Sequence, residues 1–205
     1  MKEVNPKETP RATAYELWKN APMPMVTVLK KIDVTNLVKY SKRKNVKFNM
    51  LMCYAIGVAA SKVKEFFLLP INNKLFEYSK LGINTIVVNK NGDINSCDIP
   101  FNNNLTHFNN NYTQLTQQVV ESCNNYEIDD AMIIGTSALA QYELEGVVNF
   151  YSGIYNNPFV IWSKYKKSWL KKYLIISFQF HHVQMDGAHA NEFLNELQKA
   201  VDAIK

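Results

Sequence analysis

Short apolar runs rich in β-branched and aromatic residues recur along the chain, a pattern that predicts β-strands. The run at 26–35 predicts one strand, and the run at 83–101 predicts a hairpin that turns at Asn91-Gly92 or Gly92-Asp93. The last third of the chain predicts four further strands, at 131–139, 146–154, 158–165 and 173–182.

Other stretches repeat their apolar residues at the spacing of an amphipathic helix. One helix is expected over residues 36–44, where Asp33 or Thr35 can cap its start. The next, at 48–66 with Asn49 as its cap, is apolar nearly all round until Ser61 and should therefore be deeply buried.

Two more helices are expected later in the chain. One follows an asparagine-rich stretch and has Leu115, Val119 and Val120 at helix spacing. The last runs from about Ala188 to Ile204 and carries an apolar stripe formed by Phe193, Leu194, Leu197, Val201 and Ile204.

This mixture of helices and antiparallel-looking strands predicts an α+β fold. We expect a two-layer sandwich in which helices cover a mixed, largely antiparallel sheet. The whole chain, 1–205, should form a single domain. Residues 1–14 are polar and contain two prolines, so we expect an extended arm there, and Pro22 and Pro24 exclude a helix just before the first strand.

Composition narrows the class of protein. The chain is 47% hydrophobic and 20% charged, which is typical of a globular protein with a sizeable core. Cys53, Cys97 and Cys123 are odd in number and unpatterned, which argues against a disulfide framework or a zinc knuckle. Cys53 lies in an apolar run, so we expect it to be buried.

The start of the chain, residues 1–20, has no apolar stretch of signal-peptide length, and no run in the chain approaches the roughly 20 apolar residues of a membrane span. We therefore expect a soluble, cytoplasmic protein without a membrane partner. The net charge of +5 is scattered apart from one basic patch at 163–173, "SKYKKSWLKKY". A solvated hairpin is the favoured interpretation of this patch, and phosphate contact with a nucleic acid or a cofactor is the alternative. No nucleic-acid-binding motif is present, so no such partner is expected.

Three of the four histidines fall within nine positions, in "HHVQMDGAH" at 181–189. Side chains alternate between the two faces of a strand, so His182 should share an apolar face with Phe178 and Phe180. Burial there would lower the pKa of His182 and leave it neutral, as a general base requires. Asp186 precedes Gly187 in a tight turn and could brace the loop.

Three interpretations of this cluster stay open on spacing alone. It can be a polar turn with satisfied histidines, or a metal site formed by His181, His182, Asp186 and His189. It can also be a general-base site. The metal site is disfavoured because adjacent strand residues point apart, and we expect no metal.

The motif resembles the His-His-x-x-x-Asp-Gly-x-His signature of the chloramphenicol acetyltransferases, in which a strand precedes it and a helix follows. Its shorter core is shared by a wider superfamily of CoA- and carrier-dependent acyltransferases. Four further segments are similar to the family in order and spacing: "KKIDVT" at 30–35, "VKF" at 46–48, "TSAL" at 136–139 and "SKY" at 163–165.

The resemblance implies the fold and the chemistry of that family. His182 would remove a proton from an acceptor hydroxyl, which attacks the thioester of acetyl-CoA directly, without an acyl-enzyme. Ser137 would stabilise the oxyanion. Asp186 would form a buried salt bridge with Arg11. These four residues are the expected catalytic set.

The resemblance also implies the partners. Acetyl-CoA would be a co-substrate and not a tightly bound cofactor, and Lys47, Lys164 and Tyr165 would line its site. The expected acceptor is chloramphenicol or a similar alcohol, so that the activity would inactivate the antibiotic. A homotrimer is implied, with sites at the subunit interfaces, where one subunit supplies the histidine and its neighbour much of the acceptor pocket.

Departures from the family lie on the acceptor side. Trp18 stands where the family has a tyrosine, and the aromatic residue that the family has near the position of Val26 is absent here. Ile161 stands where the family has a threonine that supports a bound water. Ala140-Gln141 replaces Pro-Trp. We therefore keep two alternatives: the same chemistry on a different hydroxyl acceptor, and a binding protein without turnover. The role of His189 is not assigned.

Overall fold

A computed structural model describes all 205 residues and confirms the α+β class. The main sheet has the strand order β2-β10-β8-β7-β5-β6, and a short β9 pairs with β10. It is mixed, because β7 runs parallel to both β5 and β8 while the other pairs are antiparallel. Its strands are β2 (Met25–Asp33), β5 (Leu81–Val88), β6 (Ile94–Pro100), β7 (Met132–Leu139), β8 (Phe159–Ser163), β9 (Lys166–Ser168) and β10 (Lys171–His181).

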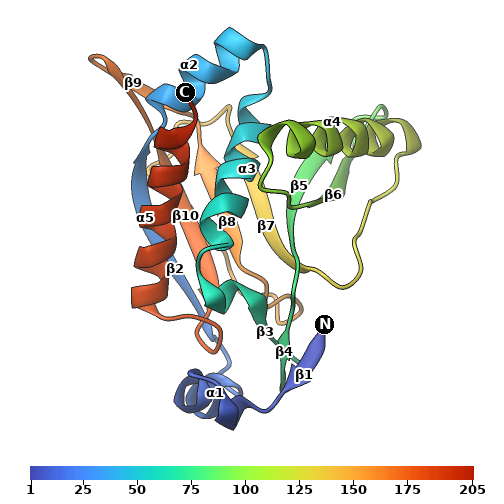
Figure 1. Cartoon of the computed structure of the whole chain (residues 1–205), viewed down its shortest axis with the longest axis vertical. Coiled ribbons are helices and arrows are strands. Elements are labelled where there is room, and N and C mark those ends of the chain that lie inside the picture. Colours follow the sequence, from blue (N-terminus) through green and yellow to red (C-terminus); the bar gives the residue numbers. More distant parts are fainter.

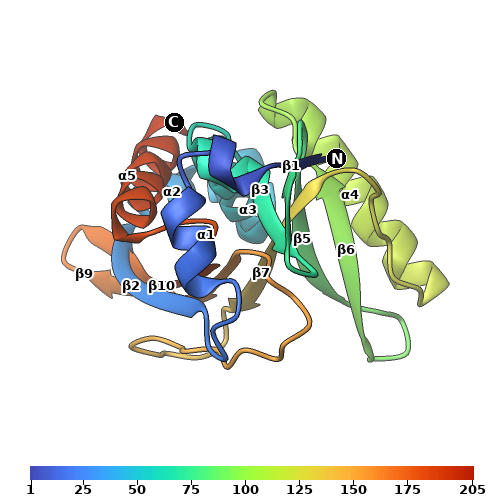
Figure 2. The ribbon, with the colours of Figure 1, turned by 90° about the horizontal axis from the view of Figure 1, so that it is seen from below.

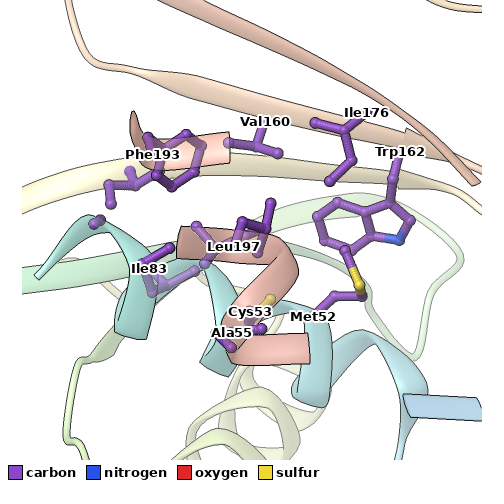
Figure 3. Packing of buried hydrophobic residues seen from close by; sticks show 14 of the residues in the cluster. Met52, Cys53, Ala55, Ile83, Val160, Trp162, Ile176, Phe193 and Leu197 are labelled. Carbon is purple, nitrogen blue, oxygen red and sulfur yellow. The ribbon is translucent and has the colours of Figure 1, made fainter. Parts of the chain in front are cut away.

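Helices form the second layer of the sandwich on one face of this sheet (Figure 1). They are α2 (Thr35–Lys44), α3 (Phe48–Ala60), α4 (Leu105–Ser122) and α5 (Gly187–Ala203). Forty buried residues between the two layers form one hydrophobic core. Figure 3 shows part of it, where Met52 and Cys53 of α3 and Leu197 of α5 lie beneath Trp162 of β8. Cys53 is fully buried, as predicted, and burial raises the pKa of its thiol to about 12. None of the helices combines the length and the apolar character that crossing a bilayer requires.

The N-terminal residues differ from the predicted extended arm. They form β1 (Lys2–Val4), a short 3-10 helix (Pro6–Glu8) and the start of α1 (Ala12–Trp18). Strand β1 joins β4 (Lys74–Glu77) and β3 (Leu68–Ile71) in a separate three-stranded sheet. The segment is ordered by buried side chains within it, Arg11 at 5% exposure and Tyr15 at 6%.

Two other predictions need correction. The second predicted helix ends at Ala60 instead of continuing to residue 66, and Asn49 lies inside it, since Lys47 occupies the cap position. Residues 146–154, predicted as a strand, form none. This segment crosses the face of the sheet that the helices leave open. Its backbone bonds to side chains of β10 instead of a strand edge: Val147 N donates to Ser177 Oγ and Asn149 O accepts from Gln179 Nε2.

Candidate active site

The histidine cluster spans the end of β10, a turn and the start of α5. His181 is the last residue of β10 and is 3% exposed. Its Nδ1 accepts a hydrogen bond from Val183 N at 3.1 Å. Burial, followed by the proximity of His182, lowers the pKa of His181 to about 4. The strand ends at His181, so His182 lies beyond the alternating pattern from which its apolar face was predicted.

His182 is held between the backbone and an aromatic ring. Its imidazole stacks on the indole of Trp18, with centroids 4.7 Å apart and planes 7° from parallel. Its backbone N donates to Pro24 O at 2.8 Å. The Nδ1 atom is buried and has no hydrogen-bond partner. Because Nδ1 is buried, Nε2 is the nitrogen that can meet a substrate proton.

Arg11 fixes the turn that carries His182. Its Nη2 donates to His182 O at 2.9 Å, its Nε to Val183 O at 3.0 Å, and its Nη1 to Asp186 Oδ2 at 2.9 Å. The ion pair between Arg11 and Asp186 that the resemblance implies is therefore present. All three nitrogens of the Arg11 guanidinium, which we call the Arg11 fork, donate hydrogen bonds to the turn. These bonds set both the position and the orientation of the turn.

Asp186 also begins α5. Its Oδ1 accepts from Ala188 N at 3.0 Å and from His189 N at 3.4 Å, as an N-cap does. Burial acts to raise the pKa of Asp186, but the hydrogen bond from Arg11 and the proximity of His189 outweigh it and lower that pKa. The side chain of His189 completes a capping box and lies 3.3 Å from Glu65 Oε1. This gives His189 a structural position that its sequence spacing left unassigned.

The three histidines make separate contacts. His181 bonds to the turn, His182 stacks on Trp18, and His189 lies between two carboxylates. No group of three or more His, Cys, Asp or Glu side chains is arranged to hold a metal ion. The geometry therefore gives no support to the metal alternative.

Ser137 lies in β7, on the face of the sheet away from the helices. Its neighbour Thr136 is fully buried and contacts Cys53 of α3, so Ser137 points to the opposite face. Ser137 pairs with Ile161 of β8, which pairs with Ser177 of β10. These three residues form one row across the sheet, which we call the serine row.

The serine row is far from the end of β10 within one chain. His181 follows Ser177 by four residues, which is about 13 Å along the strand, and Ser137 lies two strands away, about 10 Å across. A histidine and a serine side chain cannot bridge that separation to the same reacting atoms. The chain therefore holds its candidate base and its candidate oxyanion donor at two different places.

The predicted acceptor-side residues divide in the same way. Trp18 lies with His182, whereas Ile161, 6% exposed, lies beside Ser137 in the serine row. Val26 of β2 pairs with Phe180 of β10 and packs against the hydrophobic core. The structure thus brings together Trp18 with His182, and Ile161 with Ser137, but not all of these residues in one cluster.

The predicted cofactor-side residues lie near one another. Lys47 precedes α3 and lines a hollow of about 430 Å³ with Phe48 and Tyr112. The ring of Phe48 contacts that of Tyr165 at 5.6 Å, which places the segment that contains Lys164 and Tyr165 beside the start of α3. Lys47 and Lys164 are both exposed, so their charges are available to a polyanion.

Sequence reasoning missed a cavity of about 650 Å³ next to the serine row. Such a volume is typical of small-molecule sites. Its walls come from β2, β5, β6, β7, β8, β10, the segment 127–129 and the segment 149–157. The segment 149–157 had been predicted in part as a strand. No local pattern marks these residues, because they meet only when the segment crosses the sheet. They include Asn84, Asp98, Glu127, Asp129, Gly135, Tyr151, Tyr155, Asn157, Phe159 and Gln179.

The fold and the histidine turn define the class of protein. A solved chloramphenicol acetyltransferase superposes with a TM-score of 0.84 at 14% identity, over 98% of this chain and 99% of that chain. A probable dihydrolipoamide acetyltransferase from Listeria monocytogenes superposes with a TM-score of 0.72 at 11% identity, over 100% and 95% of the two chains. The fold is that of acyltransferases.

Sequence comparison identifies the family within this class. The family model described as "Chloramphenicol acetyltransferase" matches residues 3–198. A chloramphenicol acetyltransferase of Staphylococcus aureus is 27% identical over 87% of this chain and 86% of its own length. One of Clostridium butyricum is 23% identical over 82% of this chain and 80% of its own length. The chain belongs to the chloramphenicol acetyltransferase family and is an acyltransferase.

Proposed function

We propose that the protein transfers an acetyl group from acetyl-CoA to a hydroxyl group, with chloramphenicol as the first candidate acceptor. Nε2 of His182 removes the hydroxyl proton, and the oxygen attacks the thioester carbonyl directly. Ser137 donates a hydrogen bond to the resulting oxyanion, which collapses to the ester, and the thiol of CoA leaves with the proton. The observation that carries the proposal is the fixed imidazole of His182, with Nδ1 buried against the fold.

Acetyl-CoA enters this proposal as a co-substrate. The exposed Lys47 and Lys164 suit its phosphates, and the Phe48–Tyr165 contact places both lysines at one end of the molecule. The reaction requires no other group, so we propose no tightly bound cofactor and a cytoplasmic site of action, where acetyl-CoA is available. Inactivation of the antibiotic is the corresponding role in the cell.

We further propose that the active form is a homotrimer with its sites between subunits. Support comes from the separation of His182 from the serine row, which a single chain cannot close. The exposed apolar side chains of the segment that covers this row, Val148 at 72% and Phe150 at 84%, favour a covered surface. A neighbouring subunit that brings its His182 to this face would complete the site.

The direct test is release of CoA thiol from acetyl-CoA in the presence and absence of chloramphenicol. Thiol should appear only when both compounds are present, and His182→Ala should reduce the rate at least about a hundred-fold. His107→Ala is the matched control, because His107 is exposed on α4. A His182→Ala protein that is folded and keeps most of its activity would refute the assignment of the base.

A second acceptor is favoured by one observation. The large cavity includes the carboxylates of Asp98, Glu127 and Asp129, and Asp98 is 6% exposed. A neutral acceptor such as chloramphenicol has no need of these carboxylates, whereas an alcohol that also carries a basic group would pair with them. A panel of neutral and amino-bearing alcohols with the same thiol assay separates the two. Ligand binding that survives His182→Ala, with no thiol release from any alcohol, would indicate a binding protein.

A further inference from the structure

The hairpin formed by β9 and β10 projects beyond the body of the molecule (Figures 1 and 2). It ends in two exposed apolar residues. Ser168 pairs with Lys171, so the turn consists of Trp169 and Leu170. Trp169 is 89% exposed and Leu170 is 81% exposed. Large apolar side chains held in water at a projecting tip indicate a surface that another body covers.

The backbone of the turn does not explain the tryptophan. Trp169 has φ +50°, in the left-handed region that glycine and asparagine adopt readily and bulky residues seldom adopt. A glycine would form this turn with less strain. The geometry of the turn therefore gives no local reason for a tryptophan at this position.

Four lysines surround this tip. Lys166 and Lys167 lead into the turn, and Lys171 and Lys172 lead out of it. Lys166 pairs with Glu145 at 2.5 Å, while Lys171 pairs with Asp33 at 3.2 Å. Such exposed ion pairs are weak and exchange readily for another anion. Lys167 and Lys172 form no ion pair, so their ammonium groups are available beside the tip. We call Lys166, Lys167, Lys171 and Lys172 the lysine collar.

A second basic element lies at the same end of the molecule. The last turn of α2 contains Lys42, Arg43 and Lys44, all exposed, and lies at the end from which the hairpin projects (Figure 1). The two elements are tied together at their bases, where Lys172 N donates to Thr35 Oγ1 at 2.8 Å. This bond fixes the start of α2 beside the hairpin, and the three cations lie at the other end of the same helix.

We propose that this end of the protein docks on the surface of an anionic lipid bilayer. Trp169 and Leu170 would enter the boundary between headgroups and acyl chains, and the lysine collar would contact the lipid phosphates. A nucleotide would use the lysines and the indole but would leave Leu170 in water. In a homotrimer the tip would meet a different face of a second copy, and the oligomer outcome of the test separates that case. Among these bodies, an anionic bilayer matches both the apolar tip and its charges.

Such docking keeps the candidate base, His182, away from the bilayer. β10 extends from Lys171 at the hairpin to His181 beside the candidate base, a distance of about 33 Å. The contact is peripheral and requires no membrane-spanning segment. The expectation of no membrane partner rested on the lack of such segments in the sequence. Lys164 and Tyr165, proposed above for acetyl-CoA, directly precede Lys166 of the hairpin, so docking would adjoin the cofactor side of the proposed site.

The test is co-sedimentation of the full-length protein with vesicles of phosphatidylcholine alone or with about a quarter of phosphatidylserine, near physiological salt of about 0.15 M. We expect binding only to the anionic vesicles. Trp169→Gly should weaken it roughly ten-fold and fits the left-handed backbone without strain. Lys167→Gln together with Lys172→Gln should weaken it about twenty-fold or more, at about five-fold for each lysine.

Matched controls use exposed residues of the same kind elsewhere: Ile94→Ser for the apolar tip, and Lys7→Gln with Lys90→Gln for the charges. These should leave vesicle binding unchanged. Equal binding to both kinds of vesicle, or no binding, overturns the proposal. So does Trp169→Gly if it leaves vesicle binding intact but weakens CoA binding or dissociates the oligomer, since the tip would then contact the nucleotide or a second subunit.

Discussion

At the scale of single residues, adjacent histidines with almost the same sequence position have different environments. His181 is enclosed and bonds to the backbone of the turn, whereas His182 stacks on Trp18 with a buried Nδ1. The pattern of alternation indicated that the pair would be split, but it could not show where the strand ends. That end point decides which imidazole is enclosed, and it depends on the turn that Arg11 holds.

The enclosed imidazole predicts a pH-dependent stability. The pKa of His181 is about 4 in the folded protein against 6.5 in the unfolded chain, so only the unfolded chain binds a proton between these values. Stability should fall as the pH is lowered from 6.5 to 4, by about 3 kcal/mol in total. Denaturant unfolding across this window measures it. His181→Gln should flatten the dependence, whereas His107→Gln should not, and an equal slope in all three proteins would exclude His181 as its source.

The stacked pair predicts a role for Trp18 in holding His182. Trp18→Ala should lower kcat/KM up to about ten-fold, because an aromatic stack contributes about 0.5–1.5 kcal/mol. Trp18→Phe keeps a flat ring and should restore most of the activity. Leu17→Ala, in the same helix at 68% exposure, is the control. Equal losses for Phe and Ala at position 18 would show that the stacked ring is not what matters.

At the scale of elements, the parts that sequence predicted well are those formed by local pattern. The α4 and α5 stripes, the β5–β6 hairpin and β10 all appear where periodicity placed them. The segment 146–154 failed because its partners are side chains of β10 rather than a strand edge. The β3–β4 hairpin was overlooked, although Asn72-Asn73, both at positive φ, form a turn that suits asparagine. The histidine turn was predicted through its motif. The large cavity could not be predicted, since its walls come from many separate elements.

The ion pair between Arg11, at the start of α1, and Asp186, in the turn before α5, should make a measurable contribution to stability. We call this pair the tie. Arg11→Ala should lower the free energy of unfolding by about 3 kcal/mol, the low end for a broken buried pair, because Asp186 keeps some contact with solvent. Asp186→Asn should cost less, since asparagine still caps α5. Urea unfolding of both variants, and of Lys7→Ala as an exposed control, measures the difference. A loss for Arg11→Ala no larger than that of Lys7→Ala would contradict a structural role for the tie.

At the scale of the whole molecule, the sheet keeps His182 and Ser137 on different parts of one chain, which predicts that inactive variants complement each other. His182→Ala and Ser137→Ala chains should each be nearly inactive alone. After co-refolding in equal amounts, about a quarter of wild-type activity should return, because about a quarter of the interfaces then join an intact histidine to an intact serine. Thiol release measures this. The same mixture without refolding is the control, and no recovery in the co-refolded oligomer would place both groups of a site in one subunit.

The Arg11 fork has a consequence for the order of events during synthesis. It joins residues 175 positions apart, nearly the full length of the chain, and closing so long a loop is entropically costly. The ribosome makes Arg11 long before Asp186, which follows it by 175 positions. A growing chain can therefore assemble α3 and the β5–β6 hairpin early, while the histidine turn gains its fixed shape only when Asp186 meets Arg11. Competence for proton transfer would then mark a finished chain, and nascent or C-terminally truncated forms should carry the fold's first half without its base.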